Sequence, residues 1–346
     1  MKKLRIGVIG LSMGKGHVKG YKEHPAAEVV AVCDVDEKRL VEIADRFGVP
    51  SRYTSAKTMF ESERLDAVSI ATPNKFHKPL ALMAFASRCH VLSEKPMAMN
   101  AREARQMLDA AKKAGKHLMI NFSYRFLDQS VAVKNEVDSG VLGDVYFART
   151  VWHRRRGLPG FGGWFGQKAL AGGGPLIDLG VHRLDLALWL MGYPKPVWVM
   201  GSTYNHISSA LAKKEGKLFD VEDLAVGLVK FANGATLEIE ASWAANIAEA
   251  ELMETRLLGT KGGLVQRNVG EGYNFEAELY VEHDGAHYDM KLHPPVAAVR
   301  SAYYTFVETI LGNTAPVATG REGLIVMELL DAIYKSAATG RPIRIK

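Results

Sequence analysis

The chain has 346 residues, with 44 Lys and Arg against 38 Asp and Glu, which gives a formal net charge of +6. Hydrophobic residues make up 47% and charged residues 24%, so the composition excludes a disordered or fibrous chain. Only two cysteines occur, which excludes a disulfide scaffold and favours a reducing compartment, the cytoplasm. At roughly 100–200 residues per domain, the length predicts two domains.

The basic charge balance does not by itself indicate a nucleic-acid partner. The densest cationic run is the arginine triplet at 154–156, and no basic helix with interleaved aromatic residues accompanies it. The basic N-terminus is not followed by an apolar stretch of signal-peptide or membrane-spanning length, because Arg5 and two glycines interrupt it by Gly10. We therefore expect a slightly basic, soluble enzyme without nucleic-acid or membrane partners.

The first third of the chain alternates short apolar runs with helical patterns. Strands are predicted over 4–10, 28–34, 66–71, 90–93 and 117–121, and helices over about 14–23, 36–47, 76–87 and 101–114. Asp36 is the expected cap of the second helix, and Gly48 its stop. This alternation predicts an α/β fold with a doubly wound parallel sheet, a Rossmann-like domain that ends near residue 122.

The rest of the chain changes character. Longer, partly alternating strands are predicted over 144–153, 196–204, 223–231, 235–243 and 253–258, and helices near 178–191, 297–311 and 321–338. The Ala-Asn-Gly sequence at 232–234 is typical of a hairpin turn. We expect residues 123–346 to form an α+β domain on a large, mostly antiparallel open sheet.

A glycine-rich turn joins the first strand to the first helix. Gly10 and Gly14 bracket Ser12 and Met13, and Ser12 stands where the usual G-x-G-x-x-G fingerprint has its middle glycine. A tight glycine turn at a helix N-terminus suits a dinucleotide pyrophosphate, because the N–H groups there have no partner within the helix. Such turns also occur as plain packing devices.

Asp34 strengthens the cofactor hypothesis. It ends the second predicted strand, where a carboxylate accepts a hydrogen bond from the adenine ribose of NAD. The alternative is that Asp34 caps the next helix. Val35 and Asp36 offer no cation for the 2′-phosphate of NADP, and Arg39 lies one turn further on, so we predict NAD rather than NADP.

Polar residues follow two more strands of the predicted sheet, at 72–74 (Thr72, Pro73, Asn74) and 94–96 (Glu94, Lys95, Pro96). In open α/β sheets, ligands bind beyond the carboxyl ends of the strands, and Lys95 is expected in that crevice. Partial burial and a cationic nicotinamide would lower its pKa towards the range of a proton carrier. The alternative is an ion pair with Glu94.

Residues 172–185 carry the densest set of candidate catalytic groups. Asp178 and His182 are four residues apart on the predicted helix, so they share one face, with Asp185 on the same stripe. A carboxylate beside a histidine fits acid–base catalysis, because it orients the ring and raises its basicity. A surface pair and a metal site with His153 as third ligand are the alternatives, and we predict no metal.

Two further segments are candidates for substrate contact. At 152–156, alternation points His153 and Arg155 to one face, where they would meet substrate hydroxyls or form a solvated edge. The glycine-rich segment 160–166 holds Trp164, which would stack on a sugar ring or anchor the loop.

Together these motifs resemble the Gfo/Idh/MocA oxidoreductases, a family that includes glucose–fructose oxidoreductase and inositol dehydrogenases. The resemblance covers essentially the whole chain. The residues that carry it are IGVIG with the turn ending at His17, AVCDVDEKR (31–39), DAVSIATPNKFH (66–77), VLSEKPMAMN (91–100), GGGPLIDLGVHRLDLALWLMG (172–192) and LLDAIYKSAATGRPIRI (329–345). The E-K-P and D-x-x-x-H-x-x-D motifs together are the most specific.

The resemblance implies an N-terminal Rossmann domain and a C-terminal domain whose open sheet joins dimers or tetramers. It implies a catalytic lysine at Lys95, with Asp178 and His182 as its partners. The nicotinamide side of the pocket would fall on Thr72, Pro73, Asn74, His77 and Glu94. By analogy with inositol dehydrogenases, Arg125 and His153 would touch substrate, whereas residues 154–166 diverge from those enzymes.

The expected activity is oxidation of a secondary hydroxyl of a sugar, polyol or cyclitol, with hydride transfer to NAD. In this reaction His182 takes the hydroxyl proton, Asp178 holds its ring, and Lys95 hydrogen-bonds the developing alkoxide. Two alternatives stay open: a glycoside hydrolase that uses bound NAD for transient oxidation at C3, and a non-catalytic NAD-binding sugar sensor.

Overall fold

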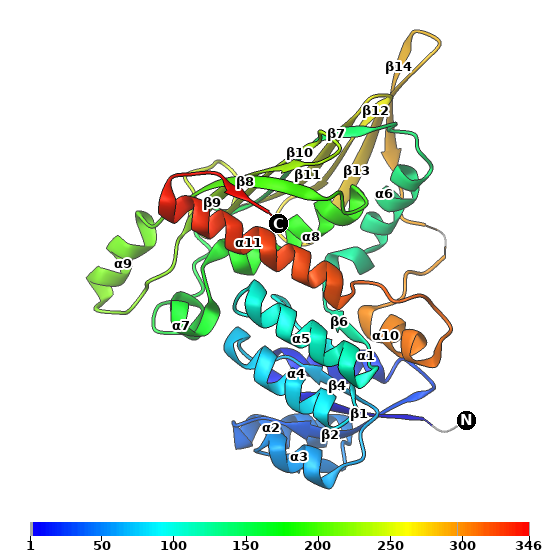
Figure 1. The fold of residues 1–346 in the computed structure, drawn as a ribbon, viewed down its shortest axis with the longest axis vertical. Coiled ribbons are helices and arrows are strands. Elements are labelled where there is room, and N and C mark those ends of the chain that lie inside the picture. The colour runs from blue at the N-terminus through cyan, green and yellow to red at the C-terminus, as the bar shows by residue number, and fades with distance from the viewer. Residues whose placement is uncertain (1–2, 296, 346) are drawn as a thin grey trace. The chain divides into compact units, whose positions relative to one another are not determined.

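The computed structural model describes residues 3–295 and 297–345, which form two compact units (Figure 1). The first unit comprises Met1–Phe122 and Arg300–Met327, and the second comprises Ser123–Val299 and Glu328–Lys346. The boundary expected after residue 122 coincides with the first division, but the grouping differs from the sequence prediction in that Arg300–Met327 returns to the first unit.

The first unit contains a six-stranded sheet in the order β3-β2-β1-β4-β5-β6, and every pairing in it is parallel. Its strands are β1 (Leu4–Ile9), β2 (Ala27–Cys33), β3 (Ser51–Tyr53), β4 (Ala67–Ile70), β5 (His90–Ser93) and β6 (Leu118–Ile120). The strands are short and, except in the edge strand β3, their central side chains are buried, as a sheet covered by helices on both faces requires. The doubly wound α/β prediction is confirmed.

Helices connect the strands of this sheet, and the predicted capping residues of α2 are found at its ends. They are α1 (Leu11–Tyr21), α2 (Glu37–Phe47), α3 (Ala56–Ser62), α4 (His77–Ala86) and α5 (Ala101–Ala114). Asp36 caps α2 by accepting from the Arg39 N–H at 3.1 Å, and Gly48 ends it in the left-handed conformation. Helix α1 begins three residues earlier than expected, and the short β3 and α3 were not predicted.

Helix α10 (Ala302–Leu311) explains why a late segment belongs to the first unit. The Tyr303 ring packs against α1, with centroids 4.7 Å from His17 and 5.5 Å from Tyr21. A Cβ on Gly20 would lie 2.1 Å from the Tyr303 ring, so only glycine lets the two helices approach. His24 adds a 2.7 Å contact to Glu308.

The second unit is built on a nine-stranded sheet in the order β14-β13-β12-β11-β7-β10-β9-β8-β15. The strands are β7 (Val145–Arg154), β8 (Pro196–Tyr204), β9 (Leu224–Phe231), β10 (Thr236–Ser242), β11 (Glu251–Gly259), β12 (Gly262–Asn268), β13 (Phe275–His283), β14 (Ala286–Leu292) and β15 (Ile343–Arg344). Only the β7–β10 pairing is parallel among the described strands of this sheet. The mostly antiparallel sheet and the hairpin at Gly234 are confirmed, whereas β12 to β14 were missed.

Helices lie against one face of this sheet in Figure 1. They include α6 (Asp128–Asp138), α8 (Val181–Leu190) and the last part of α11 (Gly320–Thr339), while the short α7 (Lys168–Ala171) and α9 (Ile207–Glu215) lie in connections. The single helix expected over 178–191 is divided, because Leu176–Gly180 is a π-helical turn that precedes α8. Single π-helical turns of this kind often occur at functional sites.

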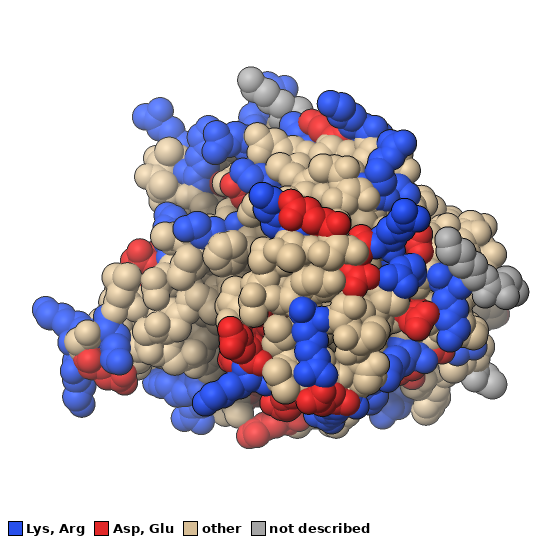
Figure 2. Space-filling view, turned by 90° about the horizontal axis from the view of Figure 1, so that it is seen from below, with Lys and Arg blue, Asp and Glu red and all other residues tan. Residues whose placement is uncertain are grey.

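No helix within the described residues combines the length and hydropathy that crossing a membrane requires. On the face drawn in Figure 2, Lys and Arg side chains alternate with Asp and Glu side chains.

Candidate functional site

The glycine turn of the first unit is shaped by close backbone contacts. Gly10 has φ +84°, and a Cβ there would lie 2.6 Å from the Ala71 carbonyl oxygen. Gly10 is also the N-cap of α1, so Ser12, Met13 and Gly14 form the first helical turn rather than a loop. This helix N-terminus meets the geometric requirement for a pyrophosphate site.

Asp34 fixes this turn to the next strand. Its side chain is buried, and Oδ2 accepts a hydrogen bond from the Leu11 N–H at 2.7 Å while Oδ1 accepts one from the Asp36 N–H at 2.9 Å. The Arg39 guanidinium lies 3.4 Å from Asp34 and 2.9 Å from Asp36. Because Asp36 is the residue that caps α2, the alternative reading of Asp34 as the cap is wrong.

His77 connects the two loops that follow β4 and β5. Its ring is fully buried, with Nδ1 2.8 Å from the Pro96 carbonyl oxygen and Nε2 2.8 Å from the Thr72 carbonyl oxygen. Burial lowers the pKa of His77 despite these two acceptors. His77 therefore holds the Lys95–Pro96 segment, whose peptide bond is cis, to the Thr72 loop.

Glu94 is held in place by a polar network around it. Its Oε1 lies 2.8 Å from His17 Nε2 and accepts from Asn121 Nδ2 at 2.6 Å, and its Oε2 accepts from the Lys95 N–H at 3.3 Å. Burial alone would raise the pKa of Glu94, but the contacts with His17 and Asn121 outweigh burial and hold the pKa below its ordinary value. The carboxylate is thus kept ionised next to Lys95.

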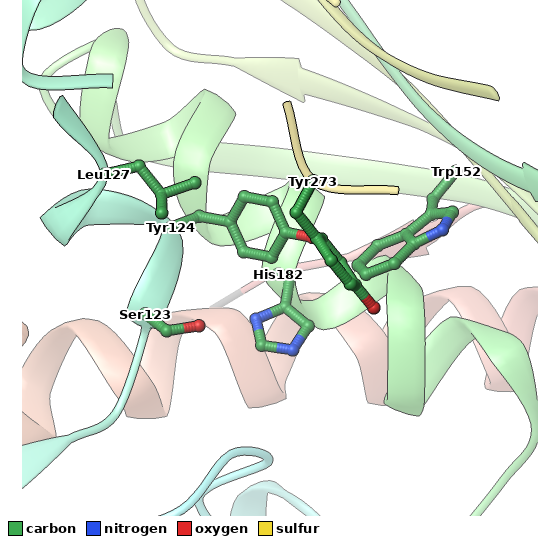
Figure 3. Close-up of a pocket in the computed structure, with 6 residues that line it drawn as sticks. All are labelled: Ser123, Tyr124, Leu127, Trp152, His182 and Tyr273. Carbon is green, nitrogen blue, oxygen red and sulfur yellow. The ribbon is translucent and has the colours of Figure 1, made fainter. Parts of the chain in front are cut away.

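The second unit contains a pocket of about 290 Å³, here called the aromatic pocket. It is lined by six residues, drawn in Figure 3: Ser123, Tyr124, Leu127, Trp152, His182 and Tyr273. They come from the segment before α6, from β7, from α8 and from the loop between β12 and β13. This volume is near the lower end for a small-molecule site.

His182, in the first turn of α8, is the predicted catalytic residue that lines this pocket. Its ring centroid lies 5.0 Å from Tyr124 and 5.8 Å from Trp152. Asp178, in the preceding π-helical turn, accepts a hydrogen bond from Trp243 Nε1 at 3.1 Å. The two residues are thus positioned by successive turns of one segment.

Arg125 and Asp185 form a buried ion pair next to the pocket. Arg125 donates to Asp185 through Nε at 2.9 Å and Nη2 at 2.6 Å, and Tyr193 Oη donates to the same carboxylate at 2.6 Å. Neither Arg125 nor Asp185 lines the aromatic pocket. Their contacts explain the packing of α8 against the segment before α6.

Besides Arg125, three other predicted substrate residues, His153, Arg155 and Trp164, do not line the aromatic pocket. His153 follows Trp152 in β7 and so points to the opposite face of the sheet, where its Nε2 lies 3.4 Å from Glu240. Burial lowers the pKa of His153. Arg155 is exposed, and Trp164 stacks on Phe165 with centroids 3.8 Å apart.

Tyr124, Trp152 and Tyr273 were not predicted as site residues. Trp152 and Arg154 were within reach of the sequence argument, because alternation in β7 places them on the face opposite His153. Tyr273 carried no signal, since the strands that flank it were missed. Among the described residues, no group of three or more His, Cys, Asp or Glu side chains could hold a metal ion.

Two family models match this chain. Residues 4–122 match the model of the GFO_IDH_MocA oxidoreductase family with an NAD-binding Rossmann fold, and residues 134–345 match its C-terminal alpha/beta domain. The chain belongs to this oxidoreductase family. The first unit therefore contains the family's NAD-binding domain.

Several characterised relatives align with this chain over nearly their whole length. The chain is 32% identical to the D-glucoside 3-dehydrogenase of Escherichia coli K12, with 99% of this chain and 97% of that protein covered. Among solved structures, it is similar to GenD2 from gentamicin A biosynthesis in complex with NAD, with 28% identity, a TM-score of 0.82 and coverage of 100% and 97%. It also resembles the aldose–aldose oxidoreductase from Caulobacter crescentus complexed with glycerol, with 25% identity, a TM-score of 0.84 and coverage of 99% and 100%.

Proposed function

We propose that this member of the family oxidises a secondary ring hydroxyl of a sugar or cyclitol, with NAD as hydride acceptor. The observation that carries the proposal is the placement of His182, a residue able to exchange protons, in a small pocket walled by aromatic side chains. The D-glucoside 3-dehydrogenase relative supports a glycoside as one substrate class.

The residues of the first unit fit NAD. The N-terminus of α1 is held over the strand ends by Gly10, and Asp34 lies at the end of β2 with Leu11 as a backbone donor. Asp34 would accept from an adenine ribose hydroxyl, and Arg39, which pairs with both neighbouring carboxylates, is not directed to a 2′-phosphate. When bound, NAD supplies the hydride acceptor of the reaction.

The proposed roles of the catalytic side chains follow from their chemistry. His182 takes the proton of the substrate hydroxyl, and Asp178 keeps the imidazole oriented. Lys95 donates a hydrogen bond to the oxygen as it becomes an alkoxide. Glu94, held ionised by His17 and Asn121, accepts from the Lys95 backbone N–H and so fixes the segment that carries the lysine. General acid–base catalysis of this kind contributes about 10²–10⁴ in rate.

The test is NADH formation by purified protein with a panel of glycosides, aldoses, inositols and alditols, each with NAD and with NADP. Signal on one substrate class supports the proposal. Release of free sugar without net NADH would instead favour the redox-assisted hydrolase. Tight sugar binding without turnover of any substrate would favour the sensor.

We also propose that the face of the nine-stranded sheet opposite α8 mediates self-association into a homodimer or homotetramer. Met200 and Leu228 are paired in register there and are 37% and 36% exposed, and Arg149 pairs with Glu240 on the same face. Sedimentation of the Leu228→Lys variant should show a smaller species than the wild type.

The thiols of Cys33 and Cys89 are free and buried, and free thiols are typical of proteins that function in a reducing compartment such as the cytoplasm.

A further inference from the structure

The three aromatic rings of the aromatic pocket differ in how far a ligand can reach them. Trp152 is 2% exposed and Tyr124 is 5% exposed, whereas Tyr273 is 60% exposed. A molecule that enters the pocket therefore meets the Tyr273 ring, while the other two rings form the wall behind it.

That back wall is fixed by satisfied polar groups. Trp152 Nε1 donates to Glu251 Oε1 at 2.8 Å, and Arg154 Nε donates to the same oxygen at 2.7 Å. The Arg154 guanidinium lies 5.3 Å from the centre of the Trp152 ring, and Tyr124 meets Trp152 edge to face at 5.6 Å. The wall is thus preorganised by one carboxylate and its two partners.

Tyr273 is attached to this wall only loosely. Its ring touches Trp152 edge to face at 6.2 Å, and its hydroxyl lies at the limit of hydrogen bonding, 3.5 Å from Arg154 Nη2. It sits in the β12–β13 loop, next to Gly272 with φ +94° and close to Gly270 with φ +66°. The backbone of the loop is held by hydrogen bonds from Asn268 to Gly270 and from Val269 to Asn274, so Tyr273 is placed by its loop rather than by its own side-chain contacts.

The lining of the pocket indicates an uncharged ligand. None of its six residues is Lys, Arg, Asp or Glu. The Trp152 N–H and the Tyr124 hydroxyl donate to Glu251 and to the Met253 sulfur, and the other polar groups of the lining are the His182 ring and the hydroxyls of Ser123 and Tyr273. In Figure 3 the Ser123 hydroxyl points towards the His182 ring, while the aromatic rings gather on the other side. The site thus offers one polar edge and one aromatic side.

A pyranose ring has the complementary shape, because its hydroxyls lie around the edge and its C–H groups form an apolar face. We propose that Tyr273 is the specificity-determining residue of the substrate site, packing its ring on the C–H face of an uncharged pyranose while the ring hydroxyls face His182 and Ser123. This inference rests on the proposed function. An open-chain polyol has no fixed face and would gain less from Tyr273.

The test compares Tyr273→Leu, Tyr273→Phe and a control, Tyr288→Leu, in the full-length protein with NAD. Tyr288 is 47% exposed on β14 and does not line the pocket, so it matches the exposure and the change in side chain. The substrate is methyl glucopyranoside or the best pyranoside of the panel, and glucitol, the open-chain counterpart, is assayed as substrate or competitive inhibitor.

We expect Tyr273→Leu to raise KM for the pyranoside about tenfold with kcat within about twofold, because lost stacking affects bound ground and transition states alike. The preference for pyranoside over glucitol should fall by the same factor, and Tyr273→Phe should restore both. Equal KM values for Tyr273→Leu and Tyr288→Leu would overturn this role while leaving the proposed function intact. A wild-type protein silent on every sugar would overturn both.

Discussion

The two units build their candidate binding residues in different ways. In the first unit, the polar groups follow neighbouring parallel strands and are held by backbone atoms and by one another, as with His77 between two carbonyls and Glu94 between His17 and Asn121. In the second unit, side chains from four separate elements close a pocket around His182. A site of the first kind is specified by local motifs, whereas the second kind depends on how distant segments pack.

Replacing His182 should have the largest effect and tests whether the aromatic pocket is a reaction site. We expect His182→Ala to lower kcat about 10²–10⁴-fold, because the hydroxyl proton loses its acceptor. His287→Ala, at an exposed histidine of β14, is the control, and NAD binding measured by calorimetry should be unchanged in both. Turnover within a few-fold of wild type would remove His182 from the mechanism.

The same experiment on the first unit sharpens the comparison. Lys95→Ala should lower kcat by a similar factor if the lysine stabilises the alkoxide. Lys75→Ala, at an exposed lysine of the helical turn Asn74–Phe76, is the control and should leave kcat unchanged. If Lys95→Ala changes only the affinity for NAD, then the first unit binds cofactor and the second carries the proton chemistry alone.

Two buried arginines of the second unit make a contrast in stability. Arg125 is paired with Asp185, so Arg125→Met strands a buried carboxylate and should cost about 3–5 kcal/mol. Within the described residues Arg183 has no carboxylate in ion-pair range, donates to Thr255 at 2.7 Å, and burial lowers its pKa to about 10. Arg183→Met should therefore cost about 1 kcal/mol or less.

Urea unfolding of both variants, followed by far-UV circular dichroism, measures this difference. Met replaces both arginines, so side-chain volume is matched between the two variants. Equal losses of unfolding free energy would show that the ion pair with Asp185 is not what makes Arg125 important.

Asp34 tests the cofactor side of the comparison. Asp34→Ser should weaken NAD binding about tenfold, because an acceptor for the ribose hydroxyl is lost, and it should improve NADP relative to NAD, because Arg39 loses a carboxylate 3.4 Å away. Asp45→Ser, on the exposed side of α2, is the control. Unchanged NAD:NADP ratios from fluorescence titration would contradict the role of Asp34.

The sequence predicts best those features that are set by residues close together in the chain. The alternation of strands and helices, the cap at Asp36 and the turn at Gly10 follow from residues within a few positions of one another. The division of the helix at Leu176–Gly180 did not follow, because a π-helical turn reflects packing: a Cβ on Gly174, just before it, would lie 2.1 Å from the Glu222 carbonyl oxygen.

The residues that line the aromatic pocket could not be predicted either, because they are brought together by packing between distant segments. The alternation in β7 places His153 and Trp152 on opposite faces of the sheet, but it does not indicate which face packs against α8. In the structure the Thr150 hydroxyl donates to the Arg183 carbonyl oxygen at 3.3 Å, so the face that carries Thr150 and Trp152 is the one that meets α8. The return of α10 to the first unit depends on Tyr303 filling the space above Gly20, a contact across more than half of the chain.

The smallest expected effect is a pH dependence confined to the first unit. His90 begins β5 and stacks on His117 with centroids 5.0 Å apart, and burial together with Lys116 and His117 lowers its pKa to about 4. Between that value and the ordinary pKa of about 6.5, the unfolded chain binds a proton that the folded chain does not, so the contribution of His90 is present above pH 6.5 and is lost as the pH falls towards 4. Because His90 is partly exposed, we expect His90→Gln to flatten the fall in unfolding free energy between pH 6.5 and 4.5 by only about 1 kcal/mol. Urea titrations at both pH values measure this, and an equally steep fall in the variant would assign the acid sensitivity to other groups.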